Sequence, residues 1–199
     1  SFLKSDVVKV VFGDPKANTS LKIINLKNFC RNFTSLTSIE GLSNLADCDV
    51  RSFENFLRGC TSFNQSIDLS KFTFSSTSIK ATSNFFKYFL RDCINFNSEI
   101  KLPTVARIYN ESPSSLHGFL YGCTKFNQPI TLPTQVSGEE CMKRFLYGCT
   151  KFNQPITLPE SVIGFGCMFE FMAECHSFNR NLVMPKTVTS TDMTGGVGR

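Results

Sequence analysis

Apolar positions recur along this chain in one phrase, Phe-x-x-x-Cys-x-x-Phe-Asn, in which rings and a thiol alternate with polar residues. Two copies, 119–133 and 145–159, are identical as FLYGCTKFNQPITLP. The cysteines of successive copies are 33, 30, 26 and 26 residues apart. These anchor cysteines are Cys60, Cys93, Cys123, Cys149 and Cys175. A recurring period of this length predicts a stacked array of repeats rather than a compact globule.

Each copy closes with two apolar residues separated by one position, usually followed by proline. This spacing places both side chains on one face of a strand, and proline then ends the strand. The pairs are Ile67/Leu69, Ile100/Leu102, Ile130/Leu132, Ile156/Leu158 and Leu182/Met184, and the prolines are Pro103, Pro133, Pro159 and Pro185. The pattern therefore predicts one very short strand in every repeat.

The ends of the chain depart from the phrase. Residues 29–42 resemble a degraded sixth copy, in which Phe33 takes the anchor position. The apolar run at 7–12 fits no repeat, so residues 1–28 are either an amino-terminal cap or the seam to a preceding domain. Met193 belongs to a last unit whose anchor does not follow, so either 194–199 is a glycine-rich unravelled end or the chain is a piece of a longer polypeptide. Between them, 29–193 holds about six repeats of 26–33 residues.

One repeat contains too few apolar side chains to close a core alone, so each must be covered by its neighbours. We expect the ring that follows each anchor to form a column, since burial of one phenylalanine contributes about 2 kcal/mol. The column comprises Phe63, Phe96, Phe126, Phe152 and Phe178. It accounts for a composition with 21 Phe and no Trp.

An asparagine follows every ring of this column. A buried side-chain amide can satisfy backbone N–H and C=O groups of a tight coil, which predicts an inward ladder. The alternative is that each asparagine caps only a local turn. The ladder comprises Asn64, Asn97, Asn127, Asn153 and Asn179.

The order Phe-x-x-Cys-x-x-Phe-x-x-x-Ile-x-Leu-Pro-x-x-Val resembles the BspA-like class of leucine-rich repeats and the related repeats of mycoplasma-type surface proteins. The resemblance covers 29–193 and is closest at 119–162. It implies a repeat solenoid, a leucine-rich-repeat-like right-handed coil with one narrow parallel β-sheet and turns or short helices on the other side. The Asn-Gln-Pro-Ile segment and insertions at 73–80 and 109–114 depart from the usual unit and leave the curvature open.

The nine cysteines show no C-x-x-C spacing, and the two histidines, His117 and His176, are far apart in sequence, which disfavours a metal site, and no cofactor is expected. Cys141 and Cys167 share a second register eight residues before an anchor. Buried free thiols are the favoured interpretation, although thiols one coil apart would lie within disulfide reach. Cys123 and Cys149 have Gly, Thr and Lys as neighbours and not a base with an orienting group, and no G-x-S-x-G motif is present, so we expect no catalytic residues and no enzyme.

The net charge of +5 is small. A nucleic-acid surface needs exposed aromatic rings beside basic groups, and because we expect the phenylalanines in the core, no specific nucleic-acid surface is expected. Weak attraction to anionic polymers or envelopes is a secondary possibility. No apolar run reaches 18 residues, so no membrane span is expected. Residues 1–10 lack a signal-peptide pattern, but a trimmed start would hide a lost signal.

Function should lie in what the repeats present outwards. The identical copies share rows of tyrosine, lysine, glutamine and threonine, which stacking would align on one extended surface. A recent duplication would also copy these letters without selection. The rows are Tyr121, Lys125, Gln128 and Thr131, with Tyr147, Lys151, Gln154 and Thr157.

These rows favour a non-catalytic protein-interaction or adhesion module of a surface-exposed repeat protein. A structural component of a phage or viral particle is the alternative, and an intracellular protein-binding effector is the third. The expected partner is a protein or surface polymer, with self-association through the carboxyl-terminal edge also open. The expected location is the surface of a cell or virion, with the cytoplasm as the remaining option.

Overall fold

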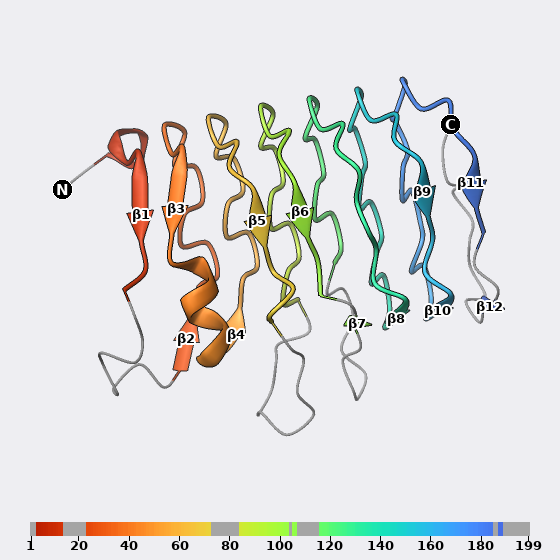
Figure 1. Cartoon of the computed structure of the whole chain (residues 1–199), viewed down its shortest axis with the longest axis horizontal. Helices are drawn as coiled ribbons and strands as arrows, with labels where there is room; N and C mark the ends of the chain where they lie inside the picture. Colours follow the sequence, from red (N-terminus) through yellow and green to blue (C-terminus); the bar gives the residue numbers. More distant parts are fainter. Residues whose placement is uncertain are drawn as a thin grey trace.

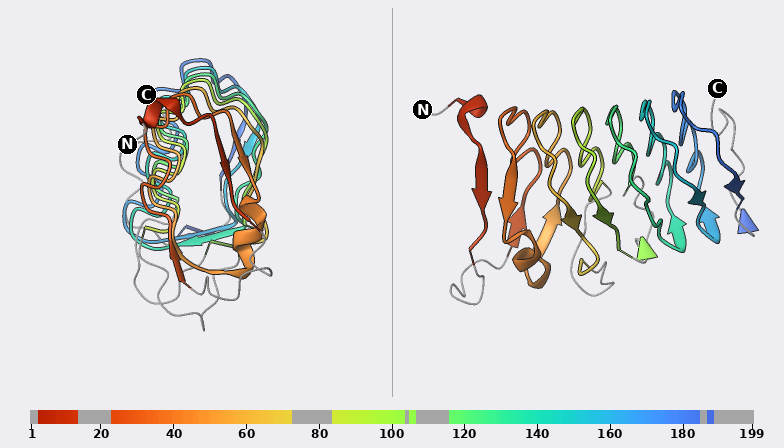
Figure 2. Two further views of the ribbon diagram at one scale, coloured as in Figure 1. Left: turned by 90° about the vertical axis from the view of Figure 1, so that its left-hand side faces the viewer. Right: turned by 45° about the horizontal axis from the view of Figure 1, so that its top comes forward.

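The repeats lie side by side along the long axis of the molecule, from β1 at one end to β11 at the other (Figure 1). The computed structural model describes residues 3–13, 23–72, 84–103, 105–106, 116–184 and 187–188. Viewed along the long axis, the successive repeats superpose as rungs around one cross-section (Figure 2). A winding wall of turns forms one side, and short strands form two of the others.

The regular elements are all short. The 3-10 helices are η1 (Lys4–Asp6) and η3 (Leu42–Asp47). The strands are β1 (Lys9–Val11), β2 (Ile23–Asn25), β3 (Ser38–Glu40), β4 (Asp49–Ser52), β5 (Ile67–Asp68), β6 (Ile100–Lys101), β7 (Val105–Ala106), β8 (Gln135–Ser137), β9 (Ile156–Thr157), β10 (Ser161–Ile163), β11 (Leu182–Val183) and β12 (Thr187–Val188). In the described part of the chain, no helix is long and apolar enough to cross a membrane.

Every strand pair is parallel and joins one rung to another. One side of the cross-section carries the pairs β1–β3, β5–β6 and β9–β11. The side below it carries β2–β4 and the four-stranded order β12–β10–β8–β7. Pairing within the described residues is thus divided among small sheets on two walls, whereas the sequence analysis expected one narrow sheet.

The apolar pairs provide the inward side of the first strand wall, with two departures. Ile130 and Leu132 are buried, but their segment makes no assigned strand between β6 and β9. Leu182 is only half-buried, and Met184 is 50% exposed because no described rung covers it. The predicted short strand is therefore absent at Ile130 and Leu132, whereas the last repeat forms it as β11.

The turn wall is held by two alternating sets of backbone hydrogen bonds. Every second N–H crosses to the next rung, as when Gly118 donates to Lys143 at 2.8 Å and Leu120 donates to Phe145 at 2.9 Å. The N–H groups between them close local turns, as when Tyr121 donates to the Gly118 carbonyl. Because both sets are satisfied, a wall without helices or strands leaves few backbone groups unpaired.

This alternation needs a left-handed residue five positions and one position before each anchor. Copies that carry glycine there adopt it readily, as at Gly118 (φ 57°) and Gly148 (φ 70°). Other copies force a residue with a side chain into the same conformation, as at Tyr88, Arg144 and Glu174. The hydrogen bonds between rungs override local preference at these positions.

Phenylalanine rings form two columns, and further buried rings such as Phe53 and Phe86 lie outside both. In the expected column, adjacent rings stack at centroid distances of 5.9 to 6.1 Å and within 11° of parallel. Its members Phe63, Phe96, Phe126 and Phe152 are buried, and Phe178 at the last rung is half-buried. A second column, four residues before each anchor position, comprises Phe29, Phe56, Phe89, Phe119, Phe145 and Phe171.

The degraded copy at 29–42 lies in the stack. Phe33 takes the anchor position, since its N–H bonds the Cys30 carbonyl as the Cys60 N–H bonds the Leu57 carbonyl. Leu36 then takes the position that Phe63 has in the next rung. The described parts of residues 1–28 join the stack, because β1 pairs with β3 and β2 pairs with β4, and this pairing fits a cap as well as the seam to a preceding domain. The insertions at 73–80 and 109–114 and the end at 194–199 lie outside the described residues.

Candidate binding surface

The asparagines form a ladder of hydrogen bonds from rung to rung. The backbone N–H of Asn97 donates to Asn64 Oδ1 at 2.7 Å, and that of Asn127 donates to Asn97 Oδ1 at 2.8 Å. Asn153 and Asn179 continue the pattern at 2.8 and 2.9 Å. The donor and acceptor residues are 33, 30, 26 and 26 positions apart, the spacings of the anchor cysteines.

The ladder lies at the surface and not in the core. Asn64, Asn97 and Asn179 are exposed, and Asn127 and Asn153 are half-buried. The prediction of an inward, buried column is therefore wrong. The phenylalanine before each asparagine points into the core, and the asparagine points outwards, because adjacent residues of an extended segment point in opposite directions.

The glutamines belong to the same ladder. Gln154 Nε2 donates to the Asn127 carbonyl at 3.1 Å and lies 3.2 Å from Asn127 Oδ1. Gln128 Nε2 lies 3.3 Å from Asn97 Oδ1. Their amides are thus already engaged within the stack, which leaves Gln128 and Gln154 less suited to holding a partner.

Tyrosine and lysine form two separate rows on the outside. The rings of Tyr121 and Tyr147 stack with centroids 4.7 Å apart and planes 9° from parallel, on the turn wall. Lys125 and Lys151 are exposed two residues after their anchors, where the chain leaves that wall. Stacking has therefore aligned equivalent side chains of adjacent rungs.

Threonine lies on a different wall. Thr157 is the outward residue of β9, and Thr131 is exposed at the equivalent place. Both line an open hollow of about 750 Å³ that crosses the rungs between Glu99 and Glu160. Since turns and strands occupy different sides of the cross-section (Figure 2), the eight residues do not share one surface, and that prediction is wrong.

The anchor thiols form a buried column of hydrogen-bond donors. Cys93 Sγ donates to the Leu57 carbonyl at 3.0 Å, and Cys123 Sγ donates to the Leu90 carbonyl at 3.1 Å. The same geometry joins Cys149 to Leu120 and Cys175 to Leu146, at 3.2 Å each.

Burial controls the chemistry of these thiols. It raises the pKa values of Cys93, Cys123 and Cys149 well above normal, and it raises that of Cys60 to about 12. Since the thiolate is the nucleophile, these anchors are poorly suited to covalent catalysis.

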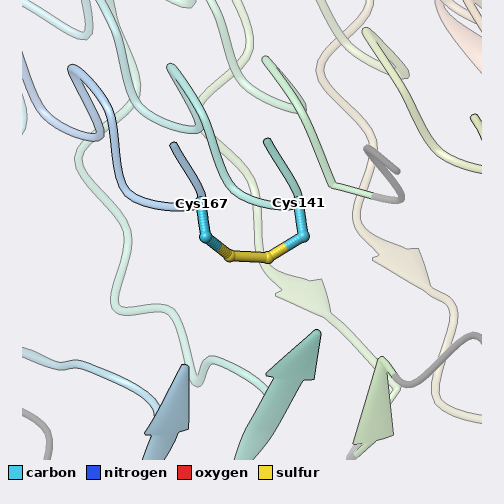
Figure 3. The surroundings of a disulfide bond; sticks show 2 residues. All are labelled: Cys141 and Cys167. Atoms are coloured by element: carbon cyan, nitrogen blue, oxygen red, sulfur yellow. A yellow bond between two sulfur atoms is a disulfide. The ribbon is translucent and has the colours of Figure 1, made fainter. Parts of the chain in front are cut away.

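Cys141 and Cys167 depart from the expectation of free thiols. They form a disulfide between adjacent rungs, with Cα atoms 4.8 Å apart (Figure 3). The favoured interpretation is wrong for this pair, because the second register places two thiols on neighbouring rungs within bonding distance. The seven free cysteines are Cys30, Cys48, Cys60, Cys93, Cys123, Cys149 and Cys175.

A buried histidine marks the turn wall near its middle. His117 Nε2 lies 3.1 Å from the Tyr88 hydroxyl, and its Nδ1 lies 3.4 Å from Glu140 Oε2 without a hydrogen bond. Burial, followed by the charge of Lys87, lowers the pKa of His117 to about 4. The imidazole is thus neutral near pH 7. Within the described residues, no group of three or more His, Cys, Asp or Glu side chains could hold a metal ion.

The turn wall also carries a row that the sequence analysis missed. The residue two positions before the anchor is Arg31, Arg58 and Arg91 in three successive rungs, and then Tyr121 and Tyr147. The carbonyls of Arg58, Arg91, Tyr121 and Tyr147 each accept an N–H from the preceding rung at 2.7 to 2.8 Å. The signal in the sequence is an arginine or tyrosine two positions before every anchor position except Cys175, where Ala173 stands.

Comparison with known proteins identifies the family. A family model described as a Mycoplasma protein of unknown function, DUF285, matches residues 16–112 and again 78–184. No curated protein and no solved structure matches the chain. Since the two matches together span well over half of its length, the chain belongs to the DUF285 family of mycoplasma proteins.

Proposed function

We propose that this chain is a non-catalytic binding module, built as a right-handed repeat solenoid similar to BspA-like leucine-rich repeats and displayed on a cell surface. The observation that carries the proposal is the stack of Tyr121 on Tyr147, which sets equivalent outward side chains one rung apart on a continuous wall. The matching family is described as a Mycoplasma protein of unknown function, so the proposal rests on this geometry.

The arrangement suits binding better than catalysis. The anchor thiols are buried, and their raised pKa values oppose nucleophilic chemistry. Large aromatic and cationic side chains on a rigid wall lose little conformational entropy when a partner covers them. Tyr121, Tyr147, Lys125 and Lys151 are the outward residues that best fit this role.

Cell binding tests the proposal. Fluorescently labelled protein is added to cultured animal epithelial cells and measured by flow cytometry. We expect saturable binding that falls at least tenfold when Tyr121, Lys125, Tyr147 and Lys151 are replaced together by alanine. The control replaces the exposed Lys4 and Lys71, which removes the same charge and should preserve binding. Absence of saturable binding, or equal binding by the fourfold variant, would contradict the proposal.

A structural role in a larger assembly is the second candidate. Its support is the apolar surface near the last described rung, where Phe165 is 57% exposed, Val183 53% and Met184 50%. In an assembly, a further element would cover these side chains. Concentration-dependent association measured by analytical ultracentrifugation, abolished by Val183→Glu, would favour this function over adhesion.

A further inference from the structure

We propose that Arg31, Arg58 and Arg91 form a binding site for a linear acidic polysaccharide, which lies along the turn wall and across the rungs. The three guanidinium groups occupy the same position of adjacent rungs, and the tyrosine pair continues their row. This inference names the ligand class for one surface of the proposed binding module and therefore rests on that function.

The arginine row has an excess of positive charge. Asp92 is the acidic residue in the ion pairs of this row. Its Oδ2 lies 3.3 Å from Arg91 Nε and 3.8 Å from Arg58 Nε. Nearby cations on the wall are matched, since Lys143 pairs with Glu140 and Arg144 pairs with Glu170. Because Asp92 pairs with two of the three arginines and one carboxylate balances one charge, the row remains attractive to anions.

The side chains of the row repel each other in the free protein. Burial, followed by the charges of Arg91 and Arg31, lowers the pKa of Arg58. In addition, Arg31 Nε is shielded from solvent and has no hydrogen-bond partner. An anion that bound across the row would relieve the repulsion and accept the hydrogen bonds of the guanidinium groups.

The geometry favours a regularly charged, extended ligand. Rungs joined by strand pairs are about 4.8 Å apart, so the row presents charges at short and regular intervals along one line. The arginine side chains are about a quarter exposed, at 26% for Arg58 and 25% for Arg91. Their position is thus largely fixed before binding, which reduces the entropy lost on association.

The tyrosines argue against a nucleic acid. Bases bind proteins by stacking on free aromatic faces. Here Tyr121 and Tyr147 cover one face of each other, Arg91 lies 4.4 Å from the centre of Tyr121, and Arg144 lies 5.5 Å from that of Tyr147. The pair therefore offers ring edges and hydroxyl groups, which suit the hydroxyl and anionic groups of a sugar chain.

Heparin serves as the probe of the acidic polysaccharide. Affinity is measured by isothermal titration at several salt concentrations, with the whole chain. We expect Arg31→Gln, Arg58→Gln and Arg91→Gln together to weaken binding at least tenfold and to reduce its salt dependence. The matched control, Lys4→Gln, Lys71→Gln and Lys101→Gln, removes the same charge from exposed positions outside the row and should weaken binding less than twofold.

Several results would overturn the inference. One is an equal loss of heparin affinity in the two triple variants, and another is no heparin binding by the unchanged protein at physiological salt. The third is tighter binding of single-stranded poly(U) or polyglutamate than of heparin. Circular dichroism establishes that each variant is folded, and Arg58→Gln alone, expected to weaken binding about threefold, replaces the triple variant if that variant unfolds. Cell binding that persists without heparin binding would contradict this site and leave the proposed adhesion function standing.

Discussion

The backbone N–H of Asn153 donates a 2.8 Å hydrogen bond to Oδ1 of Asn127, which lies 26 residues earlier in the chain. The same bond recurs in four consecutive steps along the stack. Asn97, Asn127 and Asn153 thus each accept a bond from the next rung and donate one to the preceding rung. Such a ladder requires an asparagine at the same position of every rung, even where the rungs differ in length.

The ring column should stabilise the stack most strongly at its centre. Phe126 stacks between Phe96 and Phe152 at 5.9 Å on either side and is fully buried. Phe126→Ala should lower the free energy of unfolding by about 3 to 5 kcal/mol, because it removes contacts and leaves a cavity. Urea denaturation followed by circular dichroism measures the change.

Phe178→Ala is the control for this prediction, since it alters the same repeat position at the half-buried end of the column. Its loss should be well under half of that at Phe126. Equal losses at the two positions would contradict a column whose central members are covered on both sides.

The left-handed positions of the turn wall make a second prediction. Gly118→Ala should be more destabilising than Gly148→Ala, although both residues have positive φ. At Gly148 the added Cβ meets nothing closer than 3.7 Å, so only backbone strain of about 1 to 2 kcal/mol is expected. At Gly118 the Cβ would lie 2.5 Å from the Tyr88 ring. Thermal unfolding of both variants would refute this order if Gly148→Ala were the less stable.

The buried histidine predicts a dependence of stability on pH. The pKa of His117 is lowered to about 4 in the folded chain, whereas an unfolded histidine titrates near 6.5. Between these values the unfolded state binds more protons, so the free energy of unfolding falls as the pH decreases from about 6.5 to about 4. The contribution is fully present above the unfolded pKa and amounts to about 3 kcal/mol.

The groups that face this histidine include Tyr88, Lys87, Glu140 and Lys143. Denaturation midpoints are compared between the unchanged protein and His117→Gln from pH 4 to 7, so that titrations common to both cancel. The difference between them should change with pH in that window. If the difference in midpoint between the two proteins were the same at every pH, His117 would have the same pKa in the folded and unfolded states, and the prediction would be wrong.

The cysteines should divide into two chemical classes. After denaturation without reductant, seven thiols should react with a maleimide, and peptide mapping should find Cys141 joined to Cys167. In the native protein the anchors should stay unreacted at pH 8, because they are buried and their pKa values are raised. Nine reactive thiols would contradict the disulfide, and fast native labelling of Cys123 would contradict the buried column.

The periodic part of this architecture can be predicted from the sequence. The anchor spacing locates the rungs, and the ring after each anchor lies where the repeat phrase places it, as with Phe126 and Phe152. Period alone does not say which residue of a loop faces inwards. The burial of Asn127 was therefore misjudged, although its place in a ladder was expected.

Other features depend on contacts between rungs, and the conformational preferences of single residues do not reveal these contacts. Arg144 and Glu174 adopt left-handed conformations that their own side chains disfavour. The arginine row is not visible in the two identical copies, because Tyr121 and Tyr147 occupy its position there. Alignment of all repeats on the anchor would have placed Arg31, Arg58 and Arg91 in one row.

The central claim is that equivalent residues of successive repeats lie directly on one another. Nuclear magnetic resonance tests it through the scalar coupling that a hydrogen bond transmits between its donor nitrogen and acceptor carbonyl carbon. The account predicts a coupling between the amide nitrogen of Asn153 and the side-chain carbonyl carbon of Asn127. An Asn153 amide that shows no such coupling and exchanges with water as fast as an unstructured peptide would contradict the stacked arrangement.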